Sequence, residues 1–183
     1  PLARVNICNA IPTPLAEKER QAFVAFTGKK VNNSTLYSHW ARLIEILHCA
    51  EMINDLLHDD DVLSSDLVRE GKPRLEGIGI IEAPRGTLTH HYQVDDKGMI
   101  TRCNLIVSTT HNNEAMNQAV RWVANNVISQ KGTITDGMLN QVEVAIRAYD
   151  PCLSCATQAL GQMSLRVELI NHKGELIDER IRN

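Results

Sequence analysis

The sequence predicts an α+β fold that is mainly helical, with a long central packing helix, a small antiparallel sheet and a C-terminal hairpin. Two observations predict it. Apolar residues recur at helical spacing in the first third of the chain and again from residue 113. Short β-branched or alternating runs lie between residues 78 and 108 and after residue 164. With 183 residues, 43% of them hydrophobic, the chain can bury one sizeable core, so we expect a single domain.

Two helices are expected in the first third. The first has Thr13 as its N-cap and Pro14 at the first helical position, and it ends at Gly28. The second begins at Ser34 or Thr35 and continues for about six turns, which makes it the central packing helix. Its predicted apolar face consists of Leu36, Trp40, Leu43, Leu47, Met52 or Ile53, and Leu56.

Strands are expected in the middle and at the end of the chain. The run IGIIEAPRG, residues 78–86, predicts one short strand, and residues 87–108 predict two strands joined by a turn at residues 95–98. The tail, residues 164–183, alternates polar and apolar side chains around a turn at residues 171–174. This pattern predicts a hairpin.

Helical periodicity returns between these strands, in residues 113–129 and 135–150. Thr135 or Asp136 begins the second of these helices. The Asp150–Pro151 step ends it, because the residue before a proline disfavours helix. Cys152 is therefore expected just past the end of a helix.

Charge and cysteine content exclude several classes of protein. The formal charge of −3 and the absence of a basic run argue against nucleic acid or an anionic membrane as partners. No apolar stretch reaches the length of a membrane span, and the first residues lack a signal peptide, so we expect a cytoplasmic protein. Cys8, Cys49 and Cys103 are scattered singly, which indicates reduced thiols rather than a disulfide scaffold.

Cys152 and Cys155 form a Cys-x-x-Cys pair on a turn, where both sulfurs can bind one nickel, iron or zinc ion. Three other interpretations are open: half of a zinc site, a thiol–disulfide redox pair, or two buried cysteines that act as small hydrophobes. A four-ligand zinc site needs a second such pair, which this sequence lacks. A redox pair is expected near the start of a βαβ unit rather than after a helix.

Three motifs in order, PLAR at residues 1–4, EAPRG at 82–86 and DPCLSC at 150–155, resemble the large, catalytic subunit of nickel–iron hydrogenases. The resemblance covers nearly the whole chain and is closest to the cytoplasmic bidirectional type linked to NAD(P). It implies reversible cleavage of dihydrogen at a nickel–iron centre with CO and cyanide ligands. Electrons would pass through a small iron–sulfur subunit, then through diaphorase subunits, to NAD(P). No glycine-rich dinucleotide motif occurs here, so NAD and the iron–sulfur clusters are expected on partner subunits.

The resemblance implies a role for each cysteine of the pair. Cys152 corresponds to a terminal nickel ligand and is the candidate base that accepts a proton from dihydrogen, while Cys155 corresponds to the thiolate that bridges nickel and iron. A complete site needs two further cysteines, from an Arg-x-Cys-x-x-Cys motif in the N-terminal half of the family's chain. That motif is absent from this sequence, so the chain alone is expected to be inactive.

Arg85 corresponds to an arginine over the open coordination position that donates hydrogen bonds toward cyanide, a task that suits a fixed cationic fork. Pro84 would help to shape the same pocket. Thr109 corresponds to a Ser or Thr whose hydroxyl bonds a second diatomic ligand, although Ser108 or Thr110 could be the match.

The resemblance also divides the chain at Gln158. In the family, a His or Arg stands at this position, and a nickel-dependent maturation endopeptidase cuts just after it. Residues 1–158 would then be the C-terminal portion of the large subunit, with residues 159–183 as a maturation extension. Glutamine at this position puts in doubt both the cut and a metal contact, usually to magnesium, that the family residue makes. We expect the tail to dock by Leu165, Val167, Leu169, Leu176 and Ile177, and to hold the cysteine loop open until nickel arrives.

Other conspicuous side chains are expected to be structural. His90, His91 and His111 are interpreted as ordinary strand and loop residues, and Trp40 and Trp122 as packing residues of helices. A second function remains open, a non-catalytic protein whose Cys-x-x-Cys pair holds structural zinc. A third, a hydrogenase relative that has lost its metal, is disfavoured by the surviving cysteines.

Overall fold

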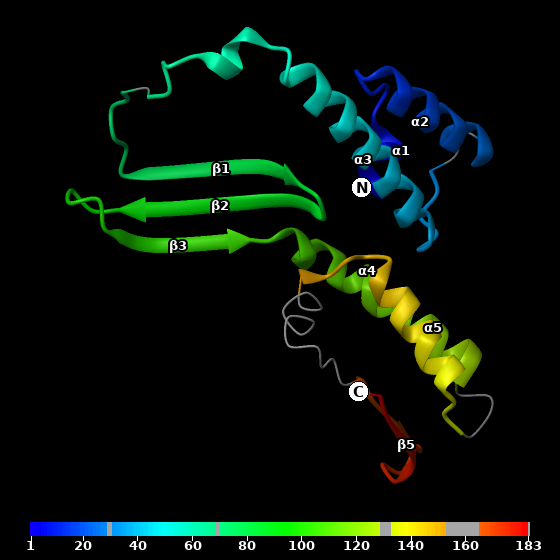
Figure 1. Ribbon diagram of the computed structural model, residues 1–183. Helices are drawn as coiled ribbons and strands as arrows, with labels where there is room; N and C mark the ends of the chain where they lie inside the picture. Colours follow the sequence, from blue (N-terminus) through cyan, green and yellow to red (C-terminus); the bar gives the residue numbers. More distant parts are fainter. Residues whose placement is uncertain (29–30, 69, 129–132, 153–164, 183) are drawn as a thin grey trace. The chain divides into compact units, whose positions relative to one another are not determined.

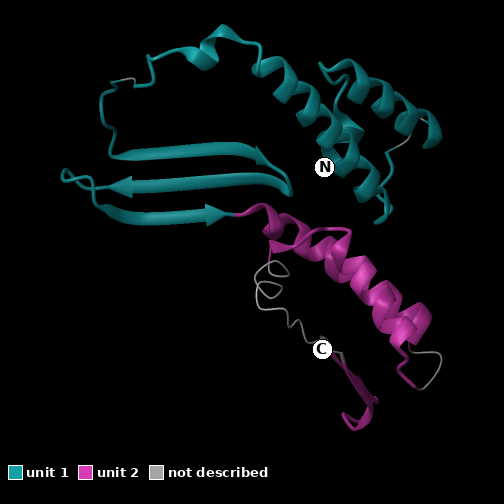
Figure 2. Cartoon of the chain, viewed as in Figure 1, with its two compact units in different colours: residues 1–106 teal, residues 107–183 magenta. Residues whose placement is uncertain are grey.

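The structure, a computed structural model, describes residues 1–28, 31–68, 70–128, 133–152 and 165–182. Its described elements are helices, a three-stranded antiparallel sheet and a two-stranded hairpin (Figure 1), which confirms the predicted α+β class. The chain divides into two compact units, Pro1–Ile106 and Val107–Asn183 (Figure 2). The expected single core is wrong: each unit has its own cluster of buried apolar residues. The three-stranded sheet contributes no fully buried residue to either cluster.

The core of the first unit lies among three helices, α1 (Leu2–Ile7), α2 (Pro14–Phe26) and α3 (Tyr37–Leu56). Its buried members are Val5, Ala16, Phe23, Ala41 and Ile44. Helix α1 was not predicted from the sequence. Thr13 and Pro14 begin α2 as predicted, and Gly28, with φ of 67°, follows its end.

Helix α3 differs from its prediction in two ways. It begins at Tyr37, because three-residue turns from Ser34 and Thr35 precede the first α-helical bond. Its buried stripe contains Ala41 and Ile44, with Trp40 and Leu47 partly buried against the same cluster. The other predicted apolar positions Leu36, Leu43, Ile53 and Leu56 are all more than half exposed. Helices α1 and α2 cover only one side of α3. The spacing of apolar residues in the sequence does not show which side of α3 they bury.

The sheet of the first unit is antiparallel, in the order β1 (Glu76–Ala83), β2 (Gly86–Val94) and β3 (Ile100–Ile106). It follows a short 3₁₀-helix, η1 (Asp60–Leu63). The strand predicted over residues 78–86 ends early, at Ala83. Pro84 and Arg85 form a two-residue loop between the paired residues Ala83 and Gly86. The predicted turn at residues 95–98 is confirmed, with Gly98 at φ of 78°.

The second unit contains α4 (Ser108–Val123), the π-helical turn η2 (Ala124–Ile128) and α5 (Asp136–Arg147). Its core comprises Val123, Ile128, Ile134, Met138, Leu139, Val142 and Ala145. Thr135 is the N-cap of α5, as predicted. Helix α4 begins five residues before the predicted start at residue 113. Its first turn, STTHN, has no apolar residue and consists of poor helix formers, so neither periodicity nor propensity could reveal it.

The predicted C-terminal hairpin is confirmed as β4 (Leu165–Ile170) and β5 (Leu176–Arg182), with Gly174 at φ of 82° in the turn. Val167 and Leu169 pack against the core of the second unit, as expected. Leu176 and Ile177 do not share that face, because each is 55% exposed. Successive strand residues point to opposite sides of a strand, so these two could not both have faced the core.

Two polar side chains of β5 complete the docking of the hairpin. Asp178 and Arg180 lie opposite Leu169 and Val167 in the strand register, and therefore on the docked face. The Asp178 carboxylate accepts a hydrogen bond from the Ile134 N–H at 2.8 Å, and Arg180 Nε donates to the Ile134 carbonyl oxygen at 3.2 Å. Both backbone groups of Ile134 are thus held by the tail.

The Asp178 contact predicts that binding of the hairpin to Ile134 depends on pH. The Ile134 N–H lowers the pKa of the Asp178 carboxyl below its ordinary value of 3.8. A carboxyl whose pKa is lowered in the folded state stabilises the fold at pH values above its ordinary pKa. This stabilisation is lost as the pH falls through the lowered pKa. We expect the Ile134 amide resonance to titrate only below about pH 4. Asp178→Asn should abolish this titration, whereas Lys173→Ala, in the exposed turn, should leave it unchanged. Titration of the amide near neutral pH would contradict this assignment.

Candidate metal centre

Cys152 follows α5 by five residues, and the segment between them is tied to α4. Ala148 is fully buried, and the Tyr149 hydroxyl donates to the carbonyl oxygen of Ala115 in α4 at 3.2 Å. Asp150 has a positive φ of 48°, a conformation that aspartate tolerates better than most residues. The buried Pro151 then fixes the backbone directly before the thiol. The DPC segment is therefore held by neighbouring structure on its N-terminal side.

This segment brings Cys152 to the start of α4. Thr109, in the first turn of α4, donates from Oγ1 to Cys152 Sγ at 3.5 Å. The two residues are 43 positions apart in the sequence, and both were predicted as site residues. Hydrogen-bond donors around a metal-bound thiolate hold the ligand in place and tune it. The contact is therefore suited to a cysteine that serves as a metal ligand.

The remaining predicted residues belong to the first unit or lie outside the described part of the chain. Arg85, half-buried, and Pro84, exposed, form the loop between β1 and β2 in the first unit. Cys155 and Gln158 lie outside the described residues. Among the residues that the structure describes, no three His, Cys, Asp or Glu side chains gather closely enough to hold a metal ion. The side chains of the described residues therefore do not by themselves complete a metal site.

Arg4, in the PLAR motif, was not predicted to make contacts with the EAPRG motif. Its Nε and Nη2 donate to the two carboxylate oxygens of Glu45 at 2.6 and 2.9 Å. Its Nη1 reaches the Glu82 carboxylate and donates to the Ala83 carbonyl oxygen at 3.0 Å. The bond that Arg4 donates to Glu82, followed by one from Thr87, lowers the pKa of the Glu82 carboxyl. The opposite charges of Arg4 in PLAR and Glu82 in EAPRG were the signal that could have linked the two motifs.

The histidines of β2 pair within the sheet. The His91 ring is 2.7 Å from a Glu76 carboxylate oxygen, and the Tyr92 hydroxyl lies 3.2 Å from His90 Nδ1. His111 was expected in a strand or loop, and this expectation is wrong, because the residue lies in helix α4. Trp122, expected to pack, is 63% exposed on the same helix.

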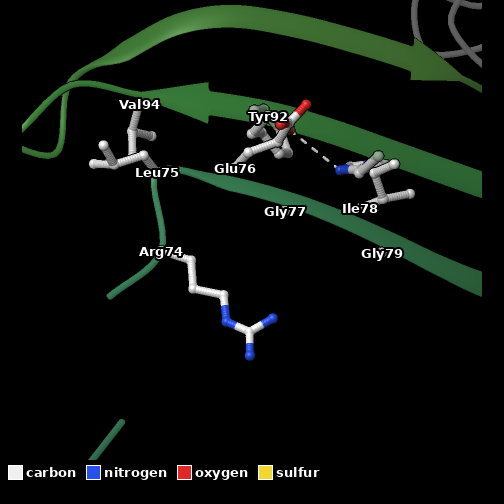
Figure 3. A pocket seen from close by; sticks show the side chains of 9 residues that line it. Arg74, Leu75, Glu76, Gly77, Ile78, Gly79, Tyr92 and Val94 are labelled. Carbon is white, nitrogen blue, oxygen red and sulfur yellow. Dashed lines mark hydrogen bonds between the residues drawn. The ribbon is translucent and has the colours of Figure 1, made fainter. Parts of the chain in front are cut away.

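An open hollow of about 530 Å³ runs along β1 and β2, between Arg74 and Val94. Figure 3 shows the side chain of Arg74 reaching out from the segment before β1. None of the predicted metal ligands lines this hollow.

Comparison with known proteins identifies the family of the chain. A sequence model described as nickel-dependent hydrogenase matches residues 1–158. The chain belongs to the nickel-dependent hydrogenase family. In this family context, the thiol that Thr109 contacts is the first cysteine of the DPCLSC motif. The family membership that the sequence motifs implied is thus confirmed.

Individual hydrogenases agree with this assignment. The chain is 53% identical over 185 residues to the NAD-reducing hydrogenase HoxS subunit beta of Cupriavidus necator, covering 100% of this chain and 38% of that protein. It is 44% identical over 164 residues to one subunit of the vhc F420-non-reducing hydrogenase of Methanococcus voltae, covering 88% and 34%. These hydrogenase subunits are therefore much longer than the present chain, which spans little more than a third of their length.

A solved hydrogenase structure has a similar fold. The crystal structure of an NAD⁺-reducing [NiFe]-hydrogenase in the H₂-reduced state matches with a TM-score of 0.79 and 54% sequence identity. The match covers 86% of this chain and 35% of that one. None of the described helices of the present chain is both long and apolar enough to cross a membrane.

Proposed function

We propose that this chain is the C-terminal portion of the catalytic large subunit of a nickel–iron hydrogenase that cleaves dihydrogen reversibly. The contact between Thr109 and Cys152 carries the proposal, because it places a supporting hydroxyl on the first cysteine of the DPCLSC motif. Similarity to an NAD-reducing hydrogenase supports NAD(P) as the final electron acceptor. Since the chain spans little more than a third of its relatives, the activity belongs to the full-length subunit in its complex.

The donor set of the DPCLSC motif fits the proposed metals. Thiolates suit nickel and iron, and the Thr109 hydroxyl can support a thiolate at Cys152. Cys152 and Cys155 would both hold the metals as thiolates, with two further cysteines supplied by upstream polypeptide. When bound, this centre, with its CO and cyanide ligands, supplies the redox-active metals at which dihydrogen is split. Without the upstream ligands, the present chain is expected to be inactive.

Each remaining residue then has a distinct task. Cys152 Sγ accepts the proton released when dihydrogen is cleaved. Arg85 would donate hydrogen bonds to the cyanide ligands and would add positive charge near the metals. Pro84 restricts the backbone that carries Arg85. Gln158 offers an amide oxygen to magnesium, a weaker ligand than a charged one.

The proposed enzyme works as a cytoplasmic complex. Electrons would leave through a small iron–sulfur subunit, then reach NAD(P) on diaphorase subunits. Purified complex that contains the full-length subunit is expected to reduce NAD⁺ with dihydrogen. A nickel-loaded complex that consumes no dihydrogen, with NAD⁺ or with a viologen dye as acceptor, would refute the proposed activity.

We further propose that residues 159–183 are a maturation extension, removed by an endopeptidase after metal insertion. The family match ends at residue 158, and the hairpin is held on the same unit that carries Cys152. By holding Ile134, near the start of α5, the hairpin would keep the cysteine loop open until nickel arrives.

Mass spectrometry of the subunit isolated with its maturation proteins tests the extension. We expect the mature subunit to lack residues 159–183. An active, nickel-loaded enzyme that retains the whole tail would show that the extension is not removed. The same preparation reports whether glutamine at position 158 is compatible with cleavage.

Thr109 provides a more local test of the proposed centre. Thr109→Val removes the hydroxyl that donates to Cys152 and should weaken nickel retention by about 10- to 100-fold, a typical cost of losing an outer-shell partner. Thr109→Ser keeps the hydroxyl and should restore retention. The control is Thr110→Val, at the exposed neighbouring residue, which should behave as wild type. Equal nickel retention in Thr109→Val and wild type during dialysis against a chelator would contradict this role.

A further inference from the structure

We propose that Arg4 is a positioning residue that fixes the loop carrying Arg85 and thereby sets the direction of the Arg85 guanidinium. The inference rests on the proposed function, because that function gives Arg85 its task. It assigns no contact between Arg4 and a metal or ligand. Arg4 acts through the backbone and carboxylate that flank the Pro84–Arg85 loop.

The Pro84–Arg85 loop needs support from outside its own hairpin. Two-residue hairpin loops favour turns with a positive φ at the first loop position, because their twist matches that of the strands. Proline is locked near φ of −65° and cannot adopt that conformation. Among the described residues other than glycine, only Asp150 has a positive φ, so Arg85 does not supply it either. Gly86, at φ of 137°, comes only after the loop.

Arg4 supplies this support by binding both residue pairs that close the loop. Ala83 pairs with Gly86, and Glu82 pairs with Thr87. Arg4 Nη1 donates to the Ala83 carbonyl oxygen at 3.0 Å and contacts the Glu82 carboxylate. The other Glu82 oxygen accepts a hydrogen bond from the Thr87 hydroxyl at 2.8 Å. One guanidinium therefore joins the two sides of the loop base through Glu82.

The opposite side of Arg4 is anchored in the helical part of the same unit. Glu45, on α3, binds Arg4 through both carboxylate oxygens, and the side chains are only 27% and 23% exposed for Arg4 and Glu45. Arg4 lies within α1, directly before Val5, which is buried in the helical core. A half-buried, bidentate pair holds its geometry better than an exposed ion pair. The loop is thus tied to the core of the first unit.

Arginine is required for this arrangement because three acceptors surround one side chain. The guanidinium presents five N–H donors in a rigid plane, whereas the lysine ammonium is a single point charge on a flexible stem. Lysine at position 4 could keep one ion pair, but it cannot hold Glu45 with two bonds and still reach the Ala83 carbonyl oxygen. Arg4→Lys therefore preserves the charge and removes the positioning.

The test uses the full-length subunit in its assembled complex, with Arg4→Lys and Arg4→Ala. Arg20→Lys is the matched control, since Arg20 also binds a carboxylate through two bonds, to Glu17 at 2.7 Å each, and donates to backbone carbonyls. Those carbonyls belong to Cys8 and Asn9, which are not among the residues that close the Arg85 loop. Two readouts are recorded: amide hydrogen exchange of residues 83–88, and the cyanide stretching bands in the infrared spectrum.

We expect amide exchange of residues 83–88 to rise by about 10-fold in Arg4→Ala and by less in Arg4→Lys, with shifted cyanide bands in both. Arg20→Lys should change neither readout. Unchanged exchange in both Arg4 variants would overturn the proposal, and so would faster exchange with unmoved cyanide bands. Cyanide bands missing from the wild-type complex would instead refute the proposed function, and this is seen before any variant is measured.

Discussion

Cys152→Ser, made in the full-length subunit within its complex, is expected to abolish dihydrogen cleavage, with a loss of more than about 1,000-fold. The hydroxyl of serine is a poor ligand for nickel at neutral pH, whereas a thiolate is a soft, strongly bound donor. The substitution also removes the group that accepts the proton. Nickel content per subunit should fall together with activity, as measured by elemental analysis and by dye reduction under dihydrogen.

Cys49→Ser is the matched control for this experiment. Cys49 is an exposed, free thiol on α3. Its replacement should leave nickel content and activity within about twofold of wild type, as expected for an exposed position that is not among the proposed site residues. A Cys152→Ser enzyme with full nickel content and normal turnover would refute the assigned role of Cys152.

Arg85→Lys is expected to reduce dihydrogen cleavage by about 100- to 1,000-fold while nickel remains bound. Lysine keeps the positive charge but loses the planar fork that can donate two parallel hydrogen bonds. The loss should therefore appear in turnover rather than in assembly of the centre. Activity is compared with nickel content in the same preparations.

Arg102→Lys, on strand β3 of the same sheet, controls for a general effect of replacing arginine. Arg102 is exposed, and its replacement should leave turnover unchanged. If Arg85→Lys lost nickel in proportion to activity, Arg85 would have a structural task in assembly instead of the electrostatic one proposed here.

Local chemistry explains which parts of the fold could be predicted from the sequence. Thr13 with Pro14 defines the start of α2, and Gly98 and Gly174 mark tight turns with positive φ. Each of these features depends on a few neighbouring residues, whose conformational preferences act over short distances. The hairpin of the tail was predictable for the same reason.

Features set by tertiary packing could not be predicted. Helix α3 has apolar residues on more than one side, and only the positions of α1 and α2 decide that Ile44 is buried and Leu43 exposed. The start of α4 has no apolar residue to show helical spacing. Asp178 docks the tail through the backbone of Ile134, a contact for which the alternating pattern of the strand provides no signal.

The candidate site was predictable only through family resemblance. Residue spacing indicated a metal-binding pair at Cys152 and Cys155 but left zinc and redox alternatives open. Thr109 is 43 positions from Cys152, and no local rule connects the two. The ion pair between Arg4 and Glu82 joins residues 78 positions apart, so it too could be found only in the folded chain.

The central claim is that Cys152 belongs to a dinuclear nickel–iron centre. Its most direct test combines elemental analysis with infrared spectroscopy on the assembled, full-length enzyme, with Cys152→Ser measured in parallel. We predict one nickel per large subunit, together with carbonyl and cyanide stretching bands, with both the nickel and the bands lost in Cys152→Ser. An enzyme that contains zinc alone at this position, and shows no such bands, would contradict the claim.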